Sequence, residues 1–490
     1  MEVSNDQWEN RISKLNELRK LGIKPYPSKS DKEVSSSYLV SNFSELEKKD
    51  KIIKYAGRIM TIRGHGGSTF MHLQDEKGRF QVYIKKDVIG DDKYSIIKKY
   101  LDLGDFISVS GKLFTTKKGE PSIMVDDFEL LAKSLNPLPE KWHGLKDTDL
   151  RFRNRHLDMI MNPEMIKIFR TRSKIIDTLR SQLNNWDYLE VETPTLQPIY
   201  GGTLAKPFKT KFNAVNREVY LRISNELYLK RLIAGGLEKI YEFSVDFRNE
   251  GIDTTHNPEF LQLETMTAYN DYEDSMKLLE ELLYQMVLTI NQSPNITYQN
   301  KKISFKKPWN KISFPNELKK ITGVDFTKSL NNFELLQGLN KKGIKIEKSA
   351  QNNKGKIAEK ILDELIAPNI VNPTIVYDYP IETSPLAKEK DGLPGWVERF
   401  EFFIAGKEIG NVYSELNDPI ALRNNLIQQQ EQYKQGDKES HPADEDFIKT
   451  MASGMPPTSG IGIGIDRLVM ILTNQTSIRE VNFFPMLKEK

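Results

Sequence analysis

Residues 247–260 read FRNEGIDTTHNPEF and are followed by LQLETMTAY. Apolar runs on both sides of this segment predict two strands joined by a loop. The segment carries a guanidinium group for a phosphate, a carboxylate for an adenine edge and an aromatic ring that can stack on a base. These groups, with an imidazole and an amide, belong to Arg248, Glu250, His256, Asn257 and Phe260. We therefore expect a nucleotide-binding site here; a surface hairpin with scattered charges is the alternative.

A second informative segment, residues 399–418, reads RFEFFIAGKEIGNVYSELND. A turn at Ala405 and Gly406 separates two strand-like runs, which predicts a hairpin. This hairpin would bring Glu401 and Glu408 near each other on adjacent strands. Two carboxylates together with nucleotide phosphates suit Mg²⁺, which prefers hard oxygen ligands and keeps several waters. The alternative is that these acids are structural groups on an exposed hairpin.

The third segment, residues 454–467, reads GMPPTSGIGIGIDR and continues into the apolar residues 468–472. Alternating glycines let a strand approach a ligand closely, and we expect Arg467 to open a helix beside that strand. The spacing does not match the dinucleotide fingerprint, and no strand–helix unit with a later acid follows. The glycines therefore do not indicate a function without the other two segments.

Residues 54–131 show a different pattern of short alternating runs, with a helical segment at residues 93–101 between the third run and the fourth. This arrangement predicts an OB-type β-barrel. Alternation through residues 80–84 directs one face inward and leaves the other outside. An outer face with aromatic and basic groups would stack unpaired bases and hold their phosphates. The candidates for that face are Arg58, Arg63, Phe70, Gln81 and Tyr83. A position in the barrel core is the alternative for Phe70.

Composition limits what these segments can do. The chain has 490 residues, enough for about three domains, and its 71 basic and 68 acidic residues give a net charge of +3. That balance excludes a protein that coats nucleic acid nonspecifically. Because there is no cysteine, disulfides, thiolate metal sites, iron–sulfur clusters and thiol nucleophiles are excluded. We expect neither a secretory signal nor a membrane span, and hence a cytoplasmic protein.

Together these segments resemble the signature motifs of class II aminoacyl-tRNA synthetases. The first motif would be the helix through Arg172 and Ile176 that runs on to NWDYLEVETPTL and ends at Pro194. The second is the FRNEG hairpin with its HNPEF continuation, and the third is GIGIGIDR. Further matches extend over nearly all of the chain, which resembles the bacterial-type lysyl-tRNA synthetases of this class. These matches are GGTLAKPF from Gly201, LRISNELYLKRL from Leu221, YPIETSPLA from Tyr379 and SELND from Ser414.

The resemblance implies an α+β fold in two parts. Residues 1–145 would form an N-terminal helix and an OB-fold anticodon-binding domain. Residues 146–490 would form a class II catalytic domain built on an antiparallel sheet, with a mostly helical insertion at residues 275–355. The implied activity is that of a lysine–tRNA ligase, which converts L-lysine and ATP to lysyl-adenylate and transfers lysine to the 3′ end of tRNA(Lys). The implied assembly is a homodimer without membrane attachment.

The resemblance also implies roles for single residues at the nucleotide. Arg248 would hold the α-phosphate and the substrate carboxylate, and Arg467 would cover adenine and reach the γ-phosphate, which makes these two the catalytic residues. Phe260 would stack on the other face of adenine. The remaining contacts would be made by Glu250, His256 and Asn257 with ATP, and by Glu401 and Glu408 with Mg²⁺.

For the amino acid, the resemblance implies an acidic pocket with an apolar wall. An ammonium group on an apolar stem needs carboxylates to pair with and an aromatic or apolar surface along its methylenes. Glu264 and Glu415 would face the side-chain ammonium, with Tyr413 beside the stem. The other lysine contacts would be Gly201, Gly202, Glu226, Asn411 and Gly462.

In the barrel, the positions implied to read a U-rich anticodon are Arg58, Phe70, Gln81 and Glu120. The chain departs from the family pattern in the lysine pocket and at the RNA. Gly67 stands where a lysine is usual, Met266 where a tyrosine is usual, Ser224–Asn225 where Ala-Pro is usual, and Lys206 where an arginine is usual.

Three other functions compete with this interpretation. An aspartyl- or asparaginyl-type synthetase shares the layout, but it would need a cationic or amide-reading pocket where this chain has Glu264 and Glu415. An enzyme that attaches lysine to proteins would lack the barrel. A noncatalytic RNA-binding paralogue would have lost the ATP-binding residues, which are present here.

Overall fold

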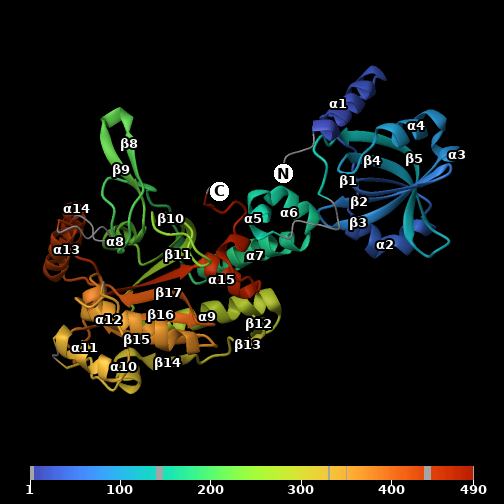
Figure 1. Ribbon diagram of the computed structural model, residues 1–490. Helices are drawn as coiled ribbons and strands as arrows, with labels where there is room; N and C mark the ends of the chain where they lie inside the picture. The colour runs from blue at the N-terminus through green and yellow to red at the C-terminus, as the bar shows by residue number, and fades with distance from the viewer. Residues whose placement is uncertain (1–4, 140–146, 329–330, 349, 435–442, 489–490) are drawn as a thin grey trace. The chain divides into compact units, whose positions relative to one another are not determined.

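The computed structural model describes residues 5–139, 147–328, 331–348, 350–434 and 443–488, which belong to two compact units (Figure 1). The first unit comprises Met1–Pro163 and the second Glu164–Lys490. The domain boundary expected between residues 145 and 146 lies outside the described residues. In the part of the chain that is described, no helix has both the length and the apolar character needed to cross a membrane.

The first unit is built around a closed barrel, which confirms the OB-type fold predicted from the alternating runs. Around the barrel the strands follow the order β1-β2-β3-β5-β4. Their bounds are β1 Ile52–His65, β2 Ser68–Asp75, β3 Gly78–Lys85, β4 Phe106–Thr115 and β5 Pro121–Ala132. The helices are α1 Asn5–Lys20, α2 Ser36–Lys48, α3 Lys86–Ile89, α4 Asp91–Tyr100, α5 Thr148–Arg153 and α6 Arg155–Met161.

Side-chain alternation separates the inside of the barrel from its outer face. Along β3, Phe80, Val82 and Ile84 are buried in the barrel core, as the alternation predicts. On the other face, the ring of Phe70 on β2 stacks on Tyr83, with ring centres 4.4 Å apart and an interplanar angle of 27°. Neither ring is fully buried. The core position considered for Phe70 is therefore wrong, and its ring lies on the outer face.

The second unit is organised by a mainly antiparallel sheet with the strand order β14-β15-β16-β17-β18-β11-β10-β6 (Figure 1). The pairs β14–β15 and β10–β6 at its two edges are parallel, and the pairs between them are antiparallel. The strand bounds are β6 Leu189–Glu190, β10 Lys239–Phe247, β11 Glu259–Ala268, β14 Asn310–Ser313, β15 Thr374–Pro380, β16 Trp396–Ile404, β17 Lys407–Ser414 and β18 Thr458–Gly464.

Three helices bury apolar faces in one core with this sheet: α7 (Glu164–Asn185), α9 (Tyr272–Asn291) and α15 (Ile465–Leu472). Leu179 and Leu283 are fully buried examples from the first two. This packing makes the sheet a rigid floor, because side chains in a close-packed core cannot shift without creating voids.

Smaller elements surround the sheet. A second sheet has the order β7-β9-β8, and Figure 1 shows β8 and β9 as a hairpin projecting from this unit. The strand bounds are β7 Leu196–Gln197, β8 Lys209–Phe212, β9 Arg217–Leu221, β12 Asn295–Tyr298 and β13 Lys301–Ser304. The remaining α-helices are α8 Glu226–Ala234, α10 Phe314–Thr322, α11 Asn332–Lys341, α12 Lys354–Ile361, α13 Pro419–Lys434, α14 Glu445–Ala452 and α16 Ile478–Val481. Short turns of helix are η1 Asn213–Val215, η2 Leu362–Ile366, η3 Ala367–Asn369 and η4 Ile381–Thr383.

The segment 275–355 differs from the mostly helical insertion expected from its sequence. It begins inside α9, whose Met276 and Leu279 belong to the main core, and it also contains the strands β12, β13 and β14. The helices α10, α11 and α12 pack in a second core cluster, which also includes residues of β15 and β16 such as Val376 and Phe403. Strands of four residues that are rich in lysine and asparagine leave too short an alternating pattern to be recognised in the sequence.

Candidate active site

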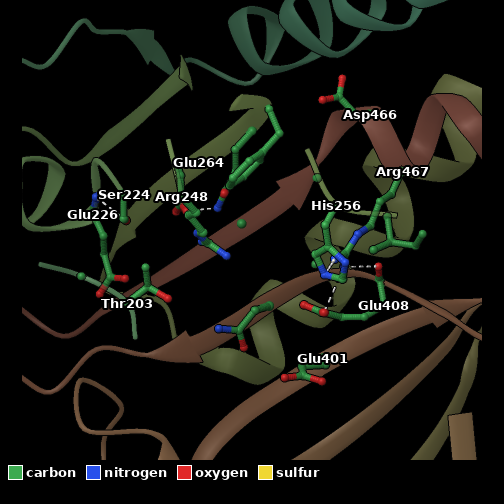
Figure 2. Close-up of a pocket in the computed structure, with 18 of the residues that line it drawn as sticks. Thr203, Ser224, Glu226, Arg248, His256, Glu264, Glu401, Glu408, Asp466 and Arg467 are labelled. Atoms are coloured by element: carbon green, nitrogen blue, oxygen red, sulfur yellow. Dashed lines mark hydrogen bonds and ion pairs between the residues drawn. The ribbon is translucent and has the colours of Figure 1, made fainter. Parts of the chain in front are cut away.

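A cavity of about 450 Å³ lies where β11, β18 and β17 run side by side (Figure 2). The loop after β10 and the helix α12 complete its wall. The structure brings together here nearly every residue expected at ATP, lysine or Mg²⁺; Gly201 is not in the wall, but its neighbour Gly202 is. The set is Gly202, Glu226, Arg248, Glu250, His256, Asn257, Phe260, Glu264, Glu401, Glu408, Asn411, Tyr413, Glu415, Gly462 and Arg467.

The alternating glycines of β18 make room for this cavity. The register places Gly462 between Glu264 on β11 and Asn411 on β17. A Cβ atom at Gly462 would lie 2.9 Å from the Gln262 side chain and 3.1 Å from Glu264 Oε1, and a Cβ at Gly460 would lie 2.6 Å from Glu415 Oε1. Larger residues would therefore push the acidic side chains out of place, which supports the interpretation of these glycines as positions of close approach.

Arg248 and Phe260 are held together by the loop that follows β10, and Arg248 lies beside Glu264 (Figure 2). The backbone N–H of Arg248 donates to the carbonyl of Pro258 at 2.8 Å, which closes the loop. The guanidinium carbon lies 4.9 Å from the centre of the Phe260 ring. The buried Nε of Arg248 has no hydrogen-bond partner among the described residues. A guanidinium with a spare donor beside an aromatic ring suits an anionic group attached to a flat base.

Arg467 is held by partners from two other segments (Figure 2). It lies in the first turn of α15, directly after the glycine strand. Its Nη1 donates to the backbone oxygen of Glu408 at 2.9 Å and pairs with Glu408 Oε2 at 3.1 Å, while its Nη2 lies 3.2 Å from His256 Nε2. His256 in turn lies 2.8 Å from Asp253 through Nδ1. The two catalytic arginine candidates thus border the same space.

The hairpin predicted around Glu401 and Glu408 is formed by β16 and β17. A register shift after Phe402 separates the two acids along the hairpin, yet both line the cavity. Glu401 accepts from Arg399 Nη2 at 2.6 Å and from the Tyr379 hydroxyl at 3.0 Å. Burial raises the pKa of Glu401 to about 8, although Arg399 opposes the shift. Burial acts in the same direction on Glu408, but Arg467 outweighs it and lowers its pKa.

Two further acids, on α12 and on the turn η2 that follows it, reach the cavity and were not found from the sequence. Glu359 on α12 and Asp363 one turn later line the wall near Glu408. Burial raises the pKa of Glu359, and burial together with Glu359 raises the pKa of Asp363 to about 6. Their spacing of four residues puts them on one helix face, but the same spacing is common on solvent-exposed helices.

At one end of the cavity, three buried carboxylates from separate segments meet. Glu226 is the first residue of α8, Glu264 lies in β11, and Glu415 follows β17. The backbone N–H of Glu226 donates to Ser224 Oγ at 3.1 Å, so Ser224 helps to place it. Burial raises the pKa of Glu264 well above its usual value, with Glu226 adding to the effect. Burial also raises the pKa of Glu415 to about 8, against the effect of Lys230.

This acidic end suits a cation with an apolar stem. An ammonium group placed among the carboxylates would relieve their mutual repulsion and favour their ionised forms. The ring of Tyr413 and the buried side chain of Met266 line the same end. The thioether of Met266 offers apolar surface and only a weak hydrogen-bond acceptor, in a position where a tyrosine would have offered a hydroxyl group.

Comparison with known proteins agrees with this geometry. Residues 147–488 match the family described as tRNA synthetases class II (D, K and N), and residues 53–131 match the OB-fold nucleic acid binding domain. The lysine–tRNA ligase of Carboxydothermus hydrogenoformans is 45% identical over 486 residues, which cover 99% of either chain. The enzyme of Bacillus subtilis is 44% identical over 494 residues, which cover 100% of this chain and 98% of its own.

The chain belongs to the class II lysine–tRNA ligase family. The match includes both compact units, so the barrel of the first unit is the nucleic-acid-binding domain of a synthetase.

On that barrel, β2 and β3 carry two of the four residues expected to read RNA, Phe70 and Gln81. Phe70 pairs with Tyr83, and His72 pairs with Gln81, across the two strands. Glu120 lies beside the outer face of these strands, with its Oε1 3.1 Å from His72 Nε2. His72 was not found from the sequence; its place two residues after Phe70 on one strand is the signal that would have indicated it. This face offers a stacked aromatic pair for a base, with polar groups next to it.

Two of the expected anticodon residues are already engaged within the barrel. Gln81 is buried and donates through Nε2 to Ser122 Oγ at 2.7 Å. Arg58 donates to the carbonyl of Gly104 at 3.1 Å, and its guanidinium carbon lies 4.1 Å from the centre of the Phe106 ring. Burial lowers the pKa of Arg58. Contact between either residue and RNA would therefore require it to share or exchange its present partner.

Proposed function

We propose that this chain is a lysine–tRNA ligase that activates L-lysine with ATP and then transfers it to tRNA(Lys). The observation that carries the proposal is one cavity with two unlike ends. Phe260 and Arg467 suit a nucleotide at one end, and Arg248 lies where the nucleotide and the amino acid would meet. The carboxylates of Glu226, Glu264 and Glu415 suit ammonium groups at the other. The lysine–tRNA ligases that the chain matches at 44–46% identity support the same assignment.

In the first step, the carboxylate of lysine attacks the α-phosphorus of ATP, and pyrophosphate leaves. No side chain needs to act as a nucleophile, because the chemistry depends on in-line positioning and neutralisation of charge. Arg248 would bind both the attacking carboxylate and the α-phosphate, so that two anions meet without repulsion. Phe260 and Arg467 would hold adenine between them, with Glu250, His256 and Asn257 as polar contacts.

The nucleotide end also fits a Mg²⁺ ion carried with ATP. Glu401 and Glu408 supply hard oxygen atoms on the cavity wall. Among the described residues there is no group of three or more histidines or acids that could hold a metal by itself. Two carboxylates completed by phosphate oxygens and water match the coordination habits of Mg²⁺. When bound, the ion would neutralise charge on the phosphates.

In the second step, a hydroxyl of the terminal ribose of tRNA attacks the lysyl-adenylate and releases AMP. We assign residues 1–145 to anticodon binding, with Phe70 and Tyr83 as the stacking platform and Glu120, Gln81 and Arg58 around it. The catalytic step would remain with residues 146–490.

We also propose that the enzyme is a homodimer. Support comes from apolar side chains left on the surface near α7. Phe483 stacks on Phe169 of α7 with ring centres 3.7 Å apart, and the adjacent Phe484 and Met486 are 76% and 56% exposed. Large exposed apolar groups in a cluster are typical of a surface that another chain covers.

Pyrophosphate exchange with each of the twenty amino acids tests the proposed function. We expect exchange with lysine alone, because an acidic or amide side chain would leave the buried carboxylates unpaired. Exchange with aspartate or asparagine in place of lysine would overturn the assignment. No exchange with any amino acid would instead support the noncatalytic paralogue.

A further inference from the structure

Lys230 is buried beside the acidic end of the cavity but is not among the residues that line it. It lies on α8, one helical turn after Glu226, and only 1% of its side chain is exposed. Its Nζ lies 2.6 Å from Glu226 Oε1 and 2.5 Å from Glu415 Oε2. The same atom lies 5.4 Å from the centre of the Tyr413 ring. Three of the residues proposed to bind lysine therefore touch this one ammonium group.

The surroundings keep Lys230 charged. Burial alone would lower its pKa, but the carboxylates of Glu226 on its own helix and Glu415 beyond β17 outweigh that effect and raise the pKa. Tyr413 on β17 places its ring beside the ammonium group of Lys230, and its hydroxyl forms a hydrogen bond with Glu226. Glu264 on β11 completes the group, since it interacts with both acids. An unpaired buried ammonium would be very costly, so its presence here reflects the acids around it.

Lys230 occupies only one side of the acidic group. Both carboxylate oxygens of Glu415 are buried and lack a hydrogen-bond partner among the described residues, but Oε2 forms an ion pair with Lys230 at 2.5 Å and Oε1 forms none. Oε1 faces the glycine strand, where a Cβ atom at Gly460 would lie 2.6 Å away. The ion pair thus engages one carboxylate oxygen of Glu415, a residue of the cavity wall, and leaves the other oxygen without a charged partner among the described residues.

We propose that Lys230 is a positioning residue that sets the charge of the lysine pocket. The three carboxylates carry three negative charges when ionised, and Lys230 balances one of them. The two that remain match the α-ammonium and the side-chain ammonium of one lysine molecule, while Arg248 is left for the substrate carboxylate. Lys230 also pairs with both Glu226 and Glu415 and thereby orients the two carboxylates. This inference rests on the proposed lysine specificity.

Lys230→Met tests the inference, because methionine keeps most of the volume and removes the charge. In pyrophosphate exchange we expect the KM for lysine to rise about 10- to 100-fold, with the KM for ATP within about 2-fold of wild type. The KM for lysine of the variant should fall between about pH 7 and about pH 8.5 more steeply than that of wild type. Without the cation, the pKa of Glu415 rises further, and a higher pH is needed to ionise this carboxylate.

Lys390→Met is the matched control. Lys390 pairs with the buried Asp378 at 2.7 Å and lies against the Tyr272 and Tyr377 rings, but it does not line the cavity. We expect the control to lose thermal stability without a change in the KM for lysine. Lys230→Gln, which keeps donor hydrogens without the charge, replaces Lys230→Met if that variant does not fold.

The outcomes separate the two proposals. If the wild-type enzyme shows no exchange with lysine, the proposed function is wrong. If it does, and the folded Lys230 variants keep a wild-type KM for lysine and a wild-type pH profile, Lys230 does not set the pocket's charge. Equal increases in the KM for lysine and the KM for ATP would indicate a merely structural role and would also overturn the inference.

Discussion

The outer face of the barrel and the cavity of the catalytic unit differ in how the chain builds them. On the barrel, Phe70, His72, Gln81 and Tyr83 lie within fourteen consecutive residues on two paired strands. The cavity draws its wall from segments between Gly202 and Ile478. The barrel face is therefore a local feature of one hairpin, whereas the cavity exists only when the large sheet has formed.

This difference bears on how each site tolerates change. A local face can lose one side chain while the neighbouring strand keeps its shape. The effect of such a substitution should therefore be limited to binding of the ligand that the lost side chain contacts. The cavity is an assembly of opposed charges in a place with little water, where removal of one group leaves another unbalanced. We expect larger effects in the cavity, and effects that differ between its two ends.

The largest effect is expected for Arg248→Ala. Loss of the guanidinium leaves the lysine carboxylate and the α-phosphate without their shared cation, so the rate of pyrophosphate exchange should fall about 100- to 1,000-fold. Binding of tRNA, measured by filter retention, should stay within about 2-fold of wild type. The control is Arg423→Ala, which removes an exposed arginine of α13 outside the cavity. Near-normal exchange in Arg248→Ala would contradict the assigned phosphate contact.

An intermediate effect, confined to one end of the cavity, is expected for Glu415→Gln. A charge-assisted hydrogen bond contributes about 1.5–3 kcal/mol, so the KM for lysine should rise about 10- to 150-fold while the KM for ATP stays unchanged. Because the pKa of Glu415 is raised to about 8, its carboxylate is protonated in a growing fraction as pH falls below that value. The wild-type KM for lysine should therefore fall as pH rises toward 8, and the variant should show a weaker dependence.

The control for this variant is Glu273→Gln on the exposed side of α9, which should alter neither constant. An unchanged KM for lysine in Glu415→Gln, with the variant folded, would remove Glu415 from the pocket. An equal rise in the KM for ATP would mean that the two ends of the cavity are not independent.

The contrast between the two sites also explains what could be predicted from sequence. The barrel, the strand–loop–strand around Arg248 and the hairpin of Glu401 each depend on neighbouring residues, and their patterns were readable. The prediction that Glu226 and Glu415 share one pocket came from the family resemblance and not from a local sequence pattern, since 189 positions of sequence separate the two residues. The topology of the fold brings these two residues together, and the periodicity of the sequence gives no information about that.

The functional side chains that could not be identified from the sequence are those whose role depends on burial. Lys230 is one of two basic residues in YLKRL, and nothing in that string says which is buried between two acids and which faces Asp444. Glu359 and Asp363 have the spacing of ordinary surface acids, yet they line the cavity. The sequence pattern placed Gln81 on the correct face of its strand. It could not reveal its hydrogen-bond partner Ser122, which lies 41 residues further on in another strand.

The smallest effect is expected for Phe70→Ala. Stacking of a base on an aromatic ring contributes about 1–3 kcal/mol, and Tyr83 remains as half of the platform, so the KM for tRNA in the charging reaction should rise about 5- to 50-fold. Lysine-dependent pyrophosphate exchange, which needs no tRNA, should be unchanged. Tyr38→Ala, which removes an aromatic ring that is 48% exposed on α2, is the control. If Phe70→Ala lowers exchange and charging equally, its ring supports the fold, and the barrel face is not the separate local site described above.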